Sequence, residues 1–146
     1  MIAIVLSHSA DNRYTANFMV QLLNMHQMFN GASSFNQDIG DWAVQSVTDM
    51  DSMFYEASAF NQDIGNWAVD SVTNMKNVFS GASAFNQDLS DWAFKSVTSM
   101  DGLFKDASSF NQDLGWCVDS DFAGEYLSFG SFDNTPCAPT NCGVMW

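Results

Sequence analysis

Four aspartates recur at one fixed spacing along the chain, and their carboxylates are the groups in this sequence best suited to chemistry. They are Asp38, Asp63, Asp88 and Asp113. If they stack about 5 Å apart, neighbouring carboxylates repel by roughly 1 kcal/mol per pair in water-like surroundings. Either of two arrangements would offset this repulsion: an Asx-type turn within each repeat, or Ca²⁺ held between carboxylates of adjacent repeats. We favour the turn, because no single repeat supplies a loop of many oxygen ligands.

Each aspartate ends a motif, Phe-Asn-Gln-Asp, that does not vary between copies. Stacked asparagines would satisfy backbone groups that are otherwise left without partners at each turn, and the phenylalanines would pack in the interior. We therefore expect a structural ladder and interpret the glutamines as an outward row. The ladder residues are Phe35, Phe60, Phe85, Phe110, Asn36, Asn61, Asn86 and Asn111.

A row of tryptophans follows the motif, at Trp42, Trp67 and Trp92. Tryptophan in a repeat usually packs against its neighbours. An exposed row beside acidic and amide side chains would instead suit stacking on sugar rings. Both interpretations are open from the sequence, so the row is a candidate ligand-binding site.

Other positions differ from copy to copy, and repeat scaffolds vary mainly at exposed sites. We expect these positions to determine any binding specificity. The candidates are Gln45, Asp70, Lys95, Asp51, Lys76 and Tyr55.

No set of residues suggests catalysis. Nothing in the sequence pairs His26 with a nucleophile, as a catalytic triad would require. We expect a protein that is not an enzyme and that needs no cofactor. The formal net charge of −13, with only 4 basic residues, also argues against nucleic-acid binding, which depends on basic groups.

Three cysteines lie beyond the last copy of the motif, at Cys117, Cys137 and Cys142. A disulfide there would indicate an oxidising compartment. We favour Cys117 bonded to Cys137 or Cys142, with a Cys137–Cys142 loop as the alternative. No apolar run is long enough to span a bilayer, and residues 1–10 do not form a clear signal peptide.

The repeat itself predicts the elements that position these residues. Met50, Met53, Phe54 and Ala57 lie at i, i+3, i+4 and i+7, the spacing of a helix that buries one face. The segments 60–64 and 67–69 are compatible with short strands. The period of 25 falls in the range of leucine-rich repeats. We therefore expect an α/β repeat: a leucine-rich-repeat-like solenoid with short parallel strands and one short helix per coil.

We interpret the chain as a single domain, residues 1–146. An N-terminal cap covers 1–23, and a disulfide-containing C-terminal cap covers 117–146. The repeats between them are 24–48, 49–73, 74–98 and 99–116.

The motif Met-Phe-(x)2-Ala-Ser-x-Phe-Asn-Gln-Asp-Ile-(x)2-Trp-x-Val-x-Ser-Val-Thr-x-Met resembles the BspA-like leucine-rich-repeat surface proteins, over about residues 24–116. The ending, with Trp116-Cys117-Val118, is similar to the C-terminal cap of algal and diatom members. One departure is the alanine at Ala43, Ala68 and Ala93, where those repeats usually have aspartate. The resemblance implies secretion or surface display, and binding or adhesion without enzymatic activity.

The function expected from the sequence is thus a non-enzymatic, extracellular or cell-surface repeat scaffold that binds a protein or a glycan. The alternative is a structural subunit of a larger extracellular or multi-subunit assembly. Calcium binding through the aspartate row is a weaker alternative.

Overall fold

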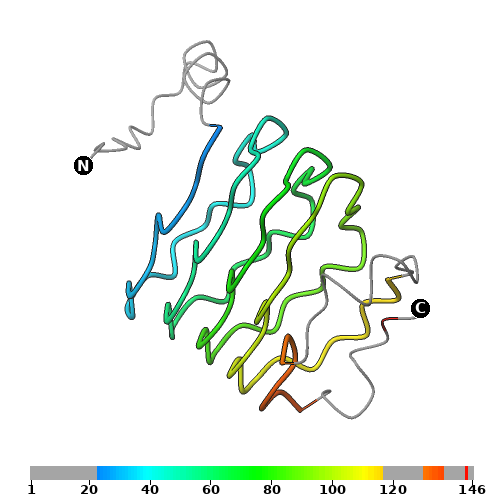
Figure 1. Cartoon of the computed structure of the whole chain (residues 1–146). Helices are drawn as coiled ribbons and strands as arrows, with labels where there is room; N and C mark the ends of the chain where they lie inside the picture. Colours follow the sequence, from blue (N-terminus) through cyan, green and yellow to red (C-terminus); the bar gives the residue numbers. More distant parts are fainter. Residues whose placement is uncertain (1–22, 117–129, 137–143, 145–146) are drawn as a thin grey trace.

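The computed structural model describes residues 23–116, 130–136 and 144. Over 23–116 the chain winds into successive coils that stack along one axis, and segment 130–136 lies against the last of them (Figure 1). The coils correspond to the repeats, and we call them coil 1 (24–48), coil 2 (49–73), coil 3 (74–98) and coil 4 (99–116). Residues that are one period apart in sequence therefore lie side by side.

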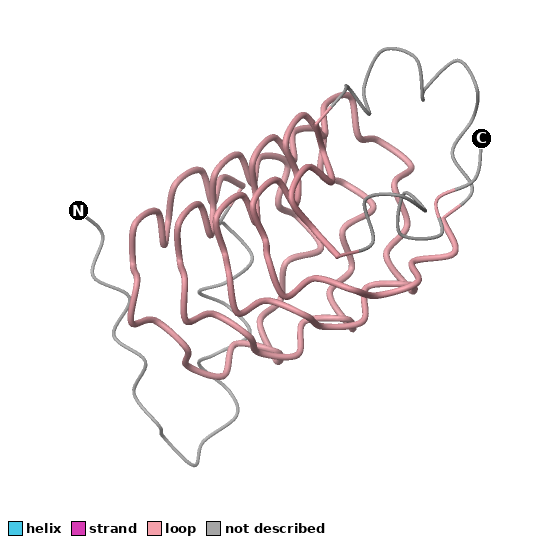
Figure 2. Cartoon of the chain, turned by 90° about the horizontal axis from the view of Figure 1, so that it is seen from below, coloured by secondary structure: helices cyan, strands magenta, loops and turns pink. Residues whose placement is uncertain are grey.

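The described residues contain no helix and no strand, only turns, bends and single bridges (Figure 2). The bridges are parallel and join Asn24 to Asp49, Asp49 to Asn74, and Asn74 to Ser99. The expected α/β architecture, a leucine-rich-repeat-like solenoid with short strands and one short helix per coil, is therefore wrong. Among these residues there is also no helix that is long and apolar enough to cross a bilayer.

The segment expected to be helical is a series of turns that bond to the next coil. In coil 2 the N–H groups of Met50, Ser52, Phe54 and Glu56 donate to carbonyls of coil 3 at 2.8–2.9 Å. The N–H groups between them close turns within the coil, as Met53 does to the carbonyl of Met50 at 3.0 Å. We call this side of the stack the turn wall; it comprises residues 25–32, 50–57, 75–82 and 100–107.

Two residues of each turn-wall segment have left-handed backbone, and an α-helix does not accommodate them. In coil 2 they are Ser52, with φ of 55°, and Glu56, with φ of 54°. Because these reversals recur every four residues, the residues between them point inward at i, i+3, i+4 and i+7. Met50, Met53, Phe54 and Ala57 are indeed all buried. The turn wall thus produces the same apolar spacing as a helix, so this spacing alone does not distinguish the two.

The segments expected to be strands are connected from coil to coil by side chains rather than by paired backbones. The N–H of Asn61 donates to the side-chain oxygen of Asn36 at 2.9 Å. An asparagine amide therefore occupies the place that a neighbouring strand's carbonyl would have in a sheet. This substitution is why 60–64 forms no strand.

The core lies inside the coils and is dominated by two stacks of aromatic rings. One stack contains Phe54 and Phe79 of the turn wall, 5.7 Å apart between ring centroids. The other contains Phe60 and Phe85, 5.8 Å apart. Within a coil the stacks touch, since the rings of Phe54 and Phe60 lie 3.9 Å apart. Phe60 and Phe54 are fully buried.

A third connection between coils comes from a column of threonines just before each turn-wall segment. The hydroxyl of Thr73 donates to the carbonyl of Thr48 at 2.9 Å, and Thr98 repeats this bond to Thr73. These hydroxyls therefore tie each coil to the preceding one.

Candidate functional site

The invariant Asn and Gln of the repeated motif form a continuous ladder along the stack. In the first three coils the asparagine oxygen accepts the N–H of the asparagine in the next coil, as Asn61 does from Asn86 at 2.9 Å. The same oxygen also accepts from the side-chain amide of the next glutamine, Gln87, at 2.8 Å. We call this the Asn–Gln ladder; it comprises Asn36, Asn61, Asn86, Asn111 and the glutamines Gln62, Gln87 and Gln112. These polar groups are largely occupied in joining coils.

The aspartates that end each motif form Asx-type turns. The carboxylate of Asp63 accepts the N–H of Gly65 at 3.0 Å, and that of Asp88 accepts the N–H of Ser90 at 2.9 Å. Asp38 and Asp113 make the same contact two residues ahead. The backbone N–H of Ser90, assisted by its hydroxyl, lowers the pKa of Asp88.

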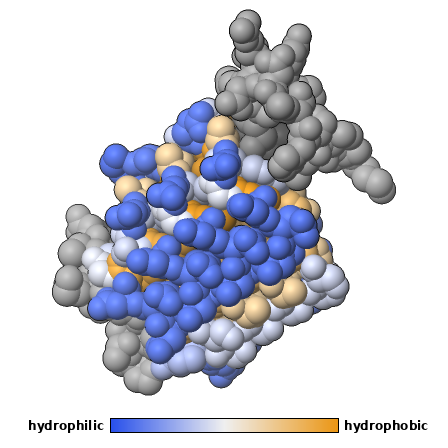
Figure 3. Space-filling view, turned by 180° about the vertical axis from the view of Figure 1, so that it is seen from behind, coloured by the Kyte–Doolittle hydropathy of each residue, from blue (hydrophilic) through white to orange (hydrophobic). Residues whose placement is uncertain are grey.

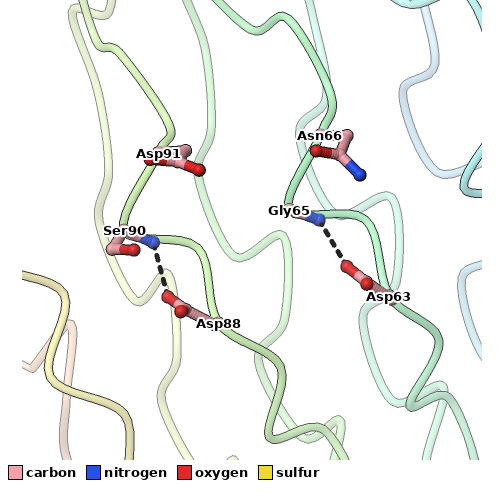
Figure 4. Close-up of a pocket in the computed structure, with 6 residues that line it drawn as sticks. All are labelled: Asp63, Gly65, Asn66, Asp88, Ser90 and Asp91. Atoms are coloured by element: carbon pink, nitrogen blue, oxygen red, sulfur yellow. Dashed lines mark hydrogen bonds between the residues drawn. The ribbon is translucent and has the colours of Figure 1, made fainter.

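Beside these turns lies an open polar pocket, shared by neighbouring coils (Figure 4). Its lining residues are Asp63, Gly65, Asn66, Asp88, Ser90 and Asp91. One face of the stack is extensively hydrophilic (Figure 3). In the part of the chain that the structure describes, no three acidic, histidine or cysteine side chains come close enough to hold a metal ion. The geometry therefore gives no support to calcium at Asp38, Asp63, Asp88 or Asp113.

The tryptophans of the inner coils face the core. Trp67 and Trp92 are 3% and 4% exposed. The indole N–H of Trp67 donates to the carbonyl of Ile39 in the preceding coil at 3.2 Å, and that of Trp92 to Ile64 at 3.1 Å. Trp42, in the first coil, is partly buried and stacks on Trp67. Because a buried ring offers no face to a sugar, Trp67 and Trp92 do not form a stacking platform.

The row of Gln45, Asp70 and Lys95 lies at the surface and carries an ion pair. Nζ of Lys95 lies 2.6 Å from Oδ1 of Asp70, and the lysine side chain is 74% exposed. The hydrogen bond from Lys95 is the main reason that the pKa of Asp70 is lowered. Gln45 is exposed. This row is accessible and differs chemically from coil to coil.

The remaining variable candidates lie on the turn wall. Lys76 is exposed, while Asp51 and Tyr55 are partly buried. Nδ1 of His26 approaches Oδ2 of Asp51 at 3.7 Å. The neighbouring charge of Glu56, which also accepts a hydrogen bond from the phenol, raises the pKa of Tyr55. Variation does not always mean exposure here, because Ser80, the counterpart of Tyr55 in coil 3, is buried.

Comparison with known proteins adds one match. A family model described as a Mycoplasma protein of unknown function, DUF285, matches residues 9–120. The chain belongs to the DUF285 family. That family is associated with BspA-like surface repeat proteins. No curated protein and no solved structure matches the chain.

The DUF285 match ends before a segment that the structure adds to the stack. Residues 130–136 form a further turn-wall rung: Phe104 donates to the carbonyl of Ser131, and Asp106 to that of Asp133, both at 2.8 Å. Phe132 continues the aromatic stack, 5.7 Å from Phe104. The sequence predicts only a C-terminal cap here, over 117–146. The available signal was Phe132 followed three residues later by small Thr135, as Phe104 is by Ala107.

The proposed disulfide partners Cys117, Cys137 and Cys142 lie outside the described residues. So does nearly all of the expected N-terminal cap, 1–23. These expectations stay predictions.

Proposed function

We propose that this DUF285 chain is a non-enzymatic scaffold, secreted or displayed at a cell surface, that binds a protein partner through the variable row Gln45, Asp70 and Lys95. The observation that carries this proposal is that invariant and variable residues have different roles within each coil. The invariant asparagines and phenylalanines are used in the ladder and the core. The residues of this row lie at the surface on an unchanging backbone, and they differ in charge from one coil to the next.

A protein partner suits this surface better than a glycan. The aromatic row that would stack on sugars is buried at Trp67 and Trp92. What the surface offers instead is a pattern of opposite charges on a strongly acidic chain, and complementary charge patterns determine partner choice and association rate in protein complexes. The resemblance of the repeat to BspA-like surface proteins supports display outside the cell. The helix-and-strand fold of those proteins is not part of this proposal.

A charge swap tests the proposal. The double variant Asp70→Lys with Lys95→Asp keeps the net charge and the possibility of an ion pair, but reverses the order of charges along the row. We expect the variant to unfold at the same temperature as the parent and to lose its hits on an array of secreted and cell-surface proteins. The matched control exchanges charge elsewhere, at Asp91→Lys with Lys105→Asp, and should keep the hits.

Three outcomes would contradict the proposal. The first is a set of hits that survives the swap. The second is binding confined to a glycan array. The third is a parent chain that binds nothing on either array.

A second candidate function, a structural subunit of a larger assembly, is favoured by one specific observation. The turn-wall carbonyls of Met28 and Asn30, in coil 1, accept from no described residue, although their counterparts in every later coil are bonded. Backbone acceptors that are unpaired at the edge of a stack can pair with another chain.

A further inference from the structure

The sequence holds a single Asn-Gly pair, Asn30-Gly31, and it lies on the turn wall in coil 1. Its counterparts in the later coils are Tyr55-Glu56, Ser80-Gly81 and Lys105-Asp106. Asparagine is among the thermally labile residues of proteins, because the backbone nitrogen that follows it can attack its side-chain amide. A glycine in the second place favours the attack, since it has no Cβ to hinder the approach and its backbone rotates freely.

The reaction at such a pair needs no reagent other than water. The Gly31 nitrogen forms a bond to Cγ of Asn30 and loses its proton, the bond from Cγ to the amide nitrogen breaks, and ammonia leaves. The product is a five-membered cyclic imide that spans the two residues. Water then opens the ring on either side. Cleavage at Cγ leaves aspartate, and cleavage at the main-chain carbonyl leaves iso-aspartate, whose backbone contains one extra carbon.

The pair is accessible to solvent. Asn30 is exposed. A Cβ added to Gly31 would meet no atom within 4 Å, whereas at Gly81, the counterpart in coil 3, it would lie 3.2 Å from the side chain of Glu56. Water and hydroxide can therefore reach the reacting atoms in the folded protein.

A backbone bond between coils 1 and 2 holds the reaction back. The N–H of Gly31 donates to the carbonyl of Tyr55 at 2.7 Å, and the carbonyl of Gly31 accepts from Ser33 at 2.8 Å. While the N–H points at Tyr55, the nitrogen keeps the proton that ring closure must remove. Backbone amides that are bonded in this way become reactive when the structure opens locally. Ring closure thus requires coil 1 to separate from coil 2 along the turn wall.

The aromatic residues of coil 1 are less buried than their counterparts in coil 2. Phe29 and Trp42 are only partly buried, whereas Phe54 and Trp67 are 0% and 3% exposed. Segments with less buried apolar surface open more readily than the rest of a fold. A local opening of coil 1 would therefore free the Gly31 nitrogen while coils 2 to 4 stay folded.

We propose that Asn30 is a site of spontaneous deamidation, and that the opening of coil 1 sets its rate. The change proceeds in one direction. Iso-aspartate lengthens the backbone between residues 30 and 31 by one carbon, so the Gly31 N–H no longer lies opposite the carbonyl of Tyr55. Coil 1 then cannot close in its original register. The inference is independent of whether the variable row binds a partner.

Peptide mapping by mass spectrometry measures the reaction. The folded chain and the chain unfolded in guanidinium chloride are incubated at mildly alkaline pH, and the conversion of each asparagine is followed with time. We expect Asn30 to convert first in both samples, and at least about ten-fold more slowly in the folded one, which equals about 1.4 kcal/mol of opening free energy. Asn30→Gln is the control, because glutamine would have to form a six-membered ring and should stay intact.

Two matched variants locate the opening. Phe29→Leu loosens coil 1 and Phe104→Leu loosens coil 4 by the same change of side chain. Phe29→Leu should speed the conversion of Asn30 by about five-fold, the effect of about 1 kcal/mol, and Phe104→Leu should leave it unchanged.

Three outcomes would overturn the proposal. The first is an equal rate of conversion in the folded and unfolded chains. The second is an Asn30 that stays intact when the chain is unfolded. The third is equal acceleration by Phe29→Leu and Phe104→Leu, since the whole stack would then open rather than coil 1.

Discussion

The turn wall and the Asn–Gln ladder join the same coils by different means, and the difference explains which residues repeat. On the turn wall, backbone donates to backbone, as from Phe54 to Val78 at 2.9 Å. On the ladder, an asparagine side chain stands between the two backbones, as Asn61 does for Asn86. Backbone bonds are available to any residue that tolerates the local dihedral angles. A side-chain bond needs one particular side chain in every coil.

The sequence varies accordingly. The first of the two left-handed positions of the turn wall is Gln27, Ser52, Asn77 or Gly102 in the successive coils. The ladder position is asparagine every time. The invariant motif is therefore best explained as the part of the scaffold where the side chain carries the connection between coils.

The largest loss of stability is expected in the core, where the turn wall meets the side of the coil that carries the Asn–Gln ladder. Phe60 lies 3.9 Å from Phe54 of the turn wall and 5.8 Å from Phe85 of the next coil. Phe60→Ala should lower the free energy of unfolding by about 3–5 kcal/mol, as for other buried phenylalanines. Urea denaturation measures this. A loss below about 1 kcal/mol would mean that the ring is not in the core.

The same substitution made on each side tests the comparison itself. Asn61→Gly removes the oxygen that accepts from Asn86 and Gln87, and it should cost about 1–3 kcal/mol of unfolding free energy, because partly buried donors lose their partner. Asn77→Gly, on the turn wall, retains the backbone bonds, and glycine adopts its φ of 53° readily. We expect a change within about 0.5 kcal/mol. Equal losses at the two sites would contradict the distinction.

A smaller effect is expected in the threonine column, which combines both kinds of bond. Both the N–H and the hydroxyl of Thr73 donate to the carbonyl of Thr48. Thr73→Val removes only the hydroxyl, so we expect a loss of about 0.5–1.5 kcal/mol in chemical denaturation. Thr73→Ser retains the hydroxyl as a control. A valine variant as stable as the serine variant would show that the hydroxyl bond adds nothing.

The ion pair on the variable row should contribute a pH-dependent increment to the stability of the folded state. Lys95 lowers the pKa of Asp70 below its ordinary value of 3.8. The folded state therefore holds the proton less tightly than the unfolded state. The resulting stability is present above the unfolded pKa and disappears as the pH falls through the folded pKa.

Thermal unfolding of Lys95→Met measures this increment. The variant should melt slightly below the parent at neutral pH, and the gap should close in acid below the ordinary pKa of Asp70. Lys105→Met serves as the control for loss of one positive charge. A difference in melting temperature that persists unchanged in acid would mean that the ion pair does not cause it.

No effect is expected from removing calcium. Each aspartate of the row is held by a backbone N–H of its own turn, as Asp63 is by Gly65. A melting scan with and without a chelator should give the same midpoint. A midpoint that falls on chelation would show that the open pocket beside Asp63 and Asp88 holds a cation after all.

Part of this structure follows directly from the sequence. The recurrence of Phe-Asn-Gln-Asp indicates stacked units of one fixed length, and the short side chain of Asp63 before Ile64-Gly65 indicates an Asx-type turn. The apolar positions Met50, Met53 and Phe54 are buried, as their spacing indicates. These features depend on local properties of the residues: the chemistry of a short side chain or its tendency to be buried.

The backbone that joins these residues does not follow from the same pattern. An i, i+3, i+4, i+7 spacing is shared by a helix and by turns with left-handed residues every four positions. Only the bonds to the next coil distinguish them, and they involve residues one coil apart, such as Phe54 and Val78. The final rung at Phe132 does not follow from the repeat either, since the step from Phe104 to Phe132 is longer than the repeat and breaks its period.

Scalar couplings across hydrogen bonds, observed by NMR, test the central distinction most directly. We predict a correlation from the amide nitrogen of Phe54 to the backbone carbonyl carbon of Val78, and one from the amide nitrogen of Asn86 to the side-chain carbonyl carbon of Asn61. A correlation from Phe54 to Met50, the partner it would have in a helix, would contradict the turn wall. A correlation from Asn86 to a backbone carbonyl of coil 2 would contradict the ladder.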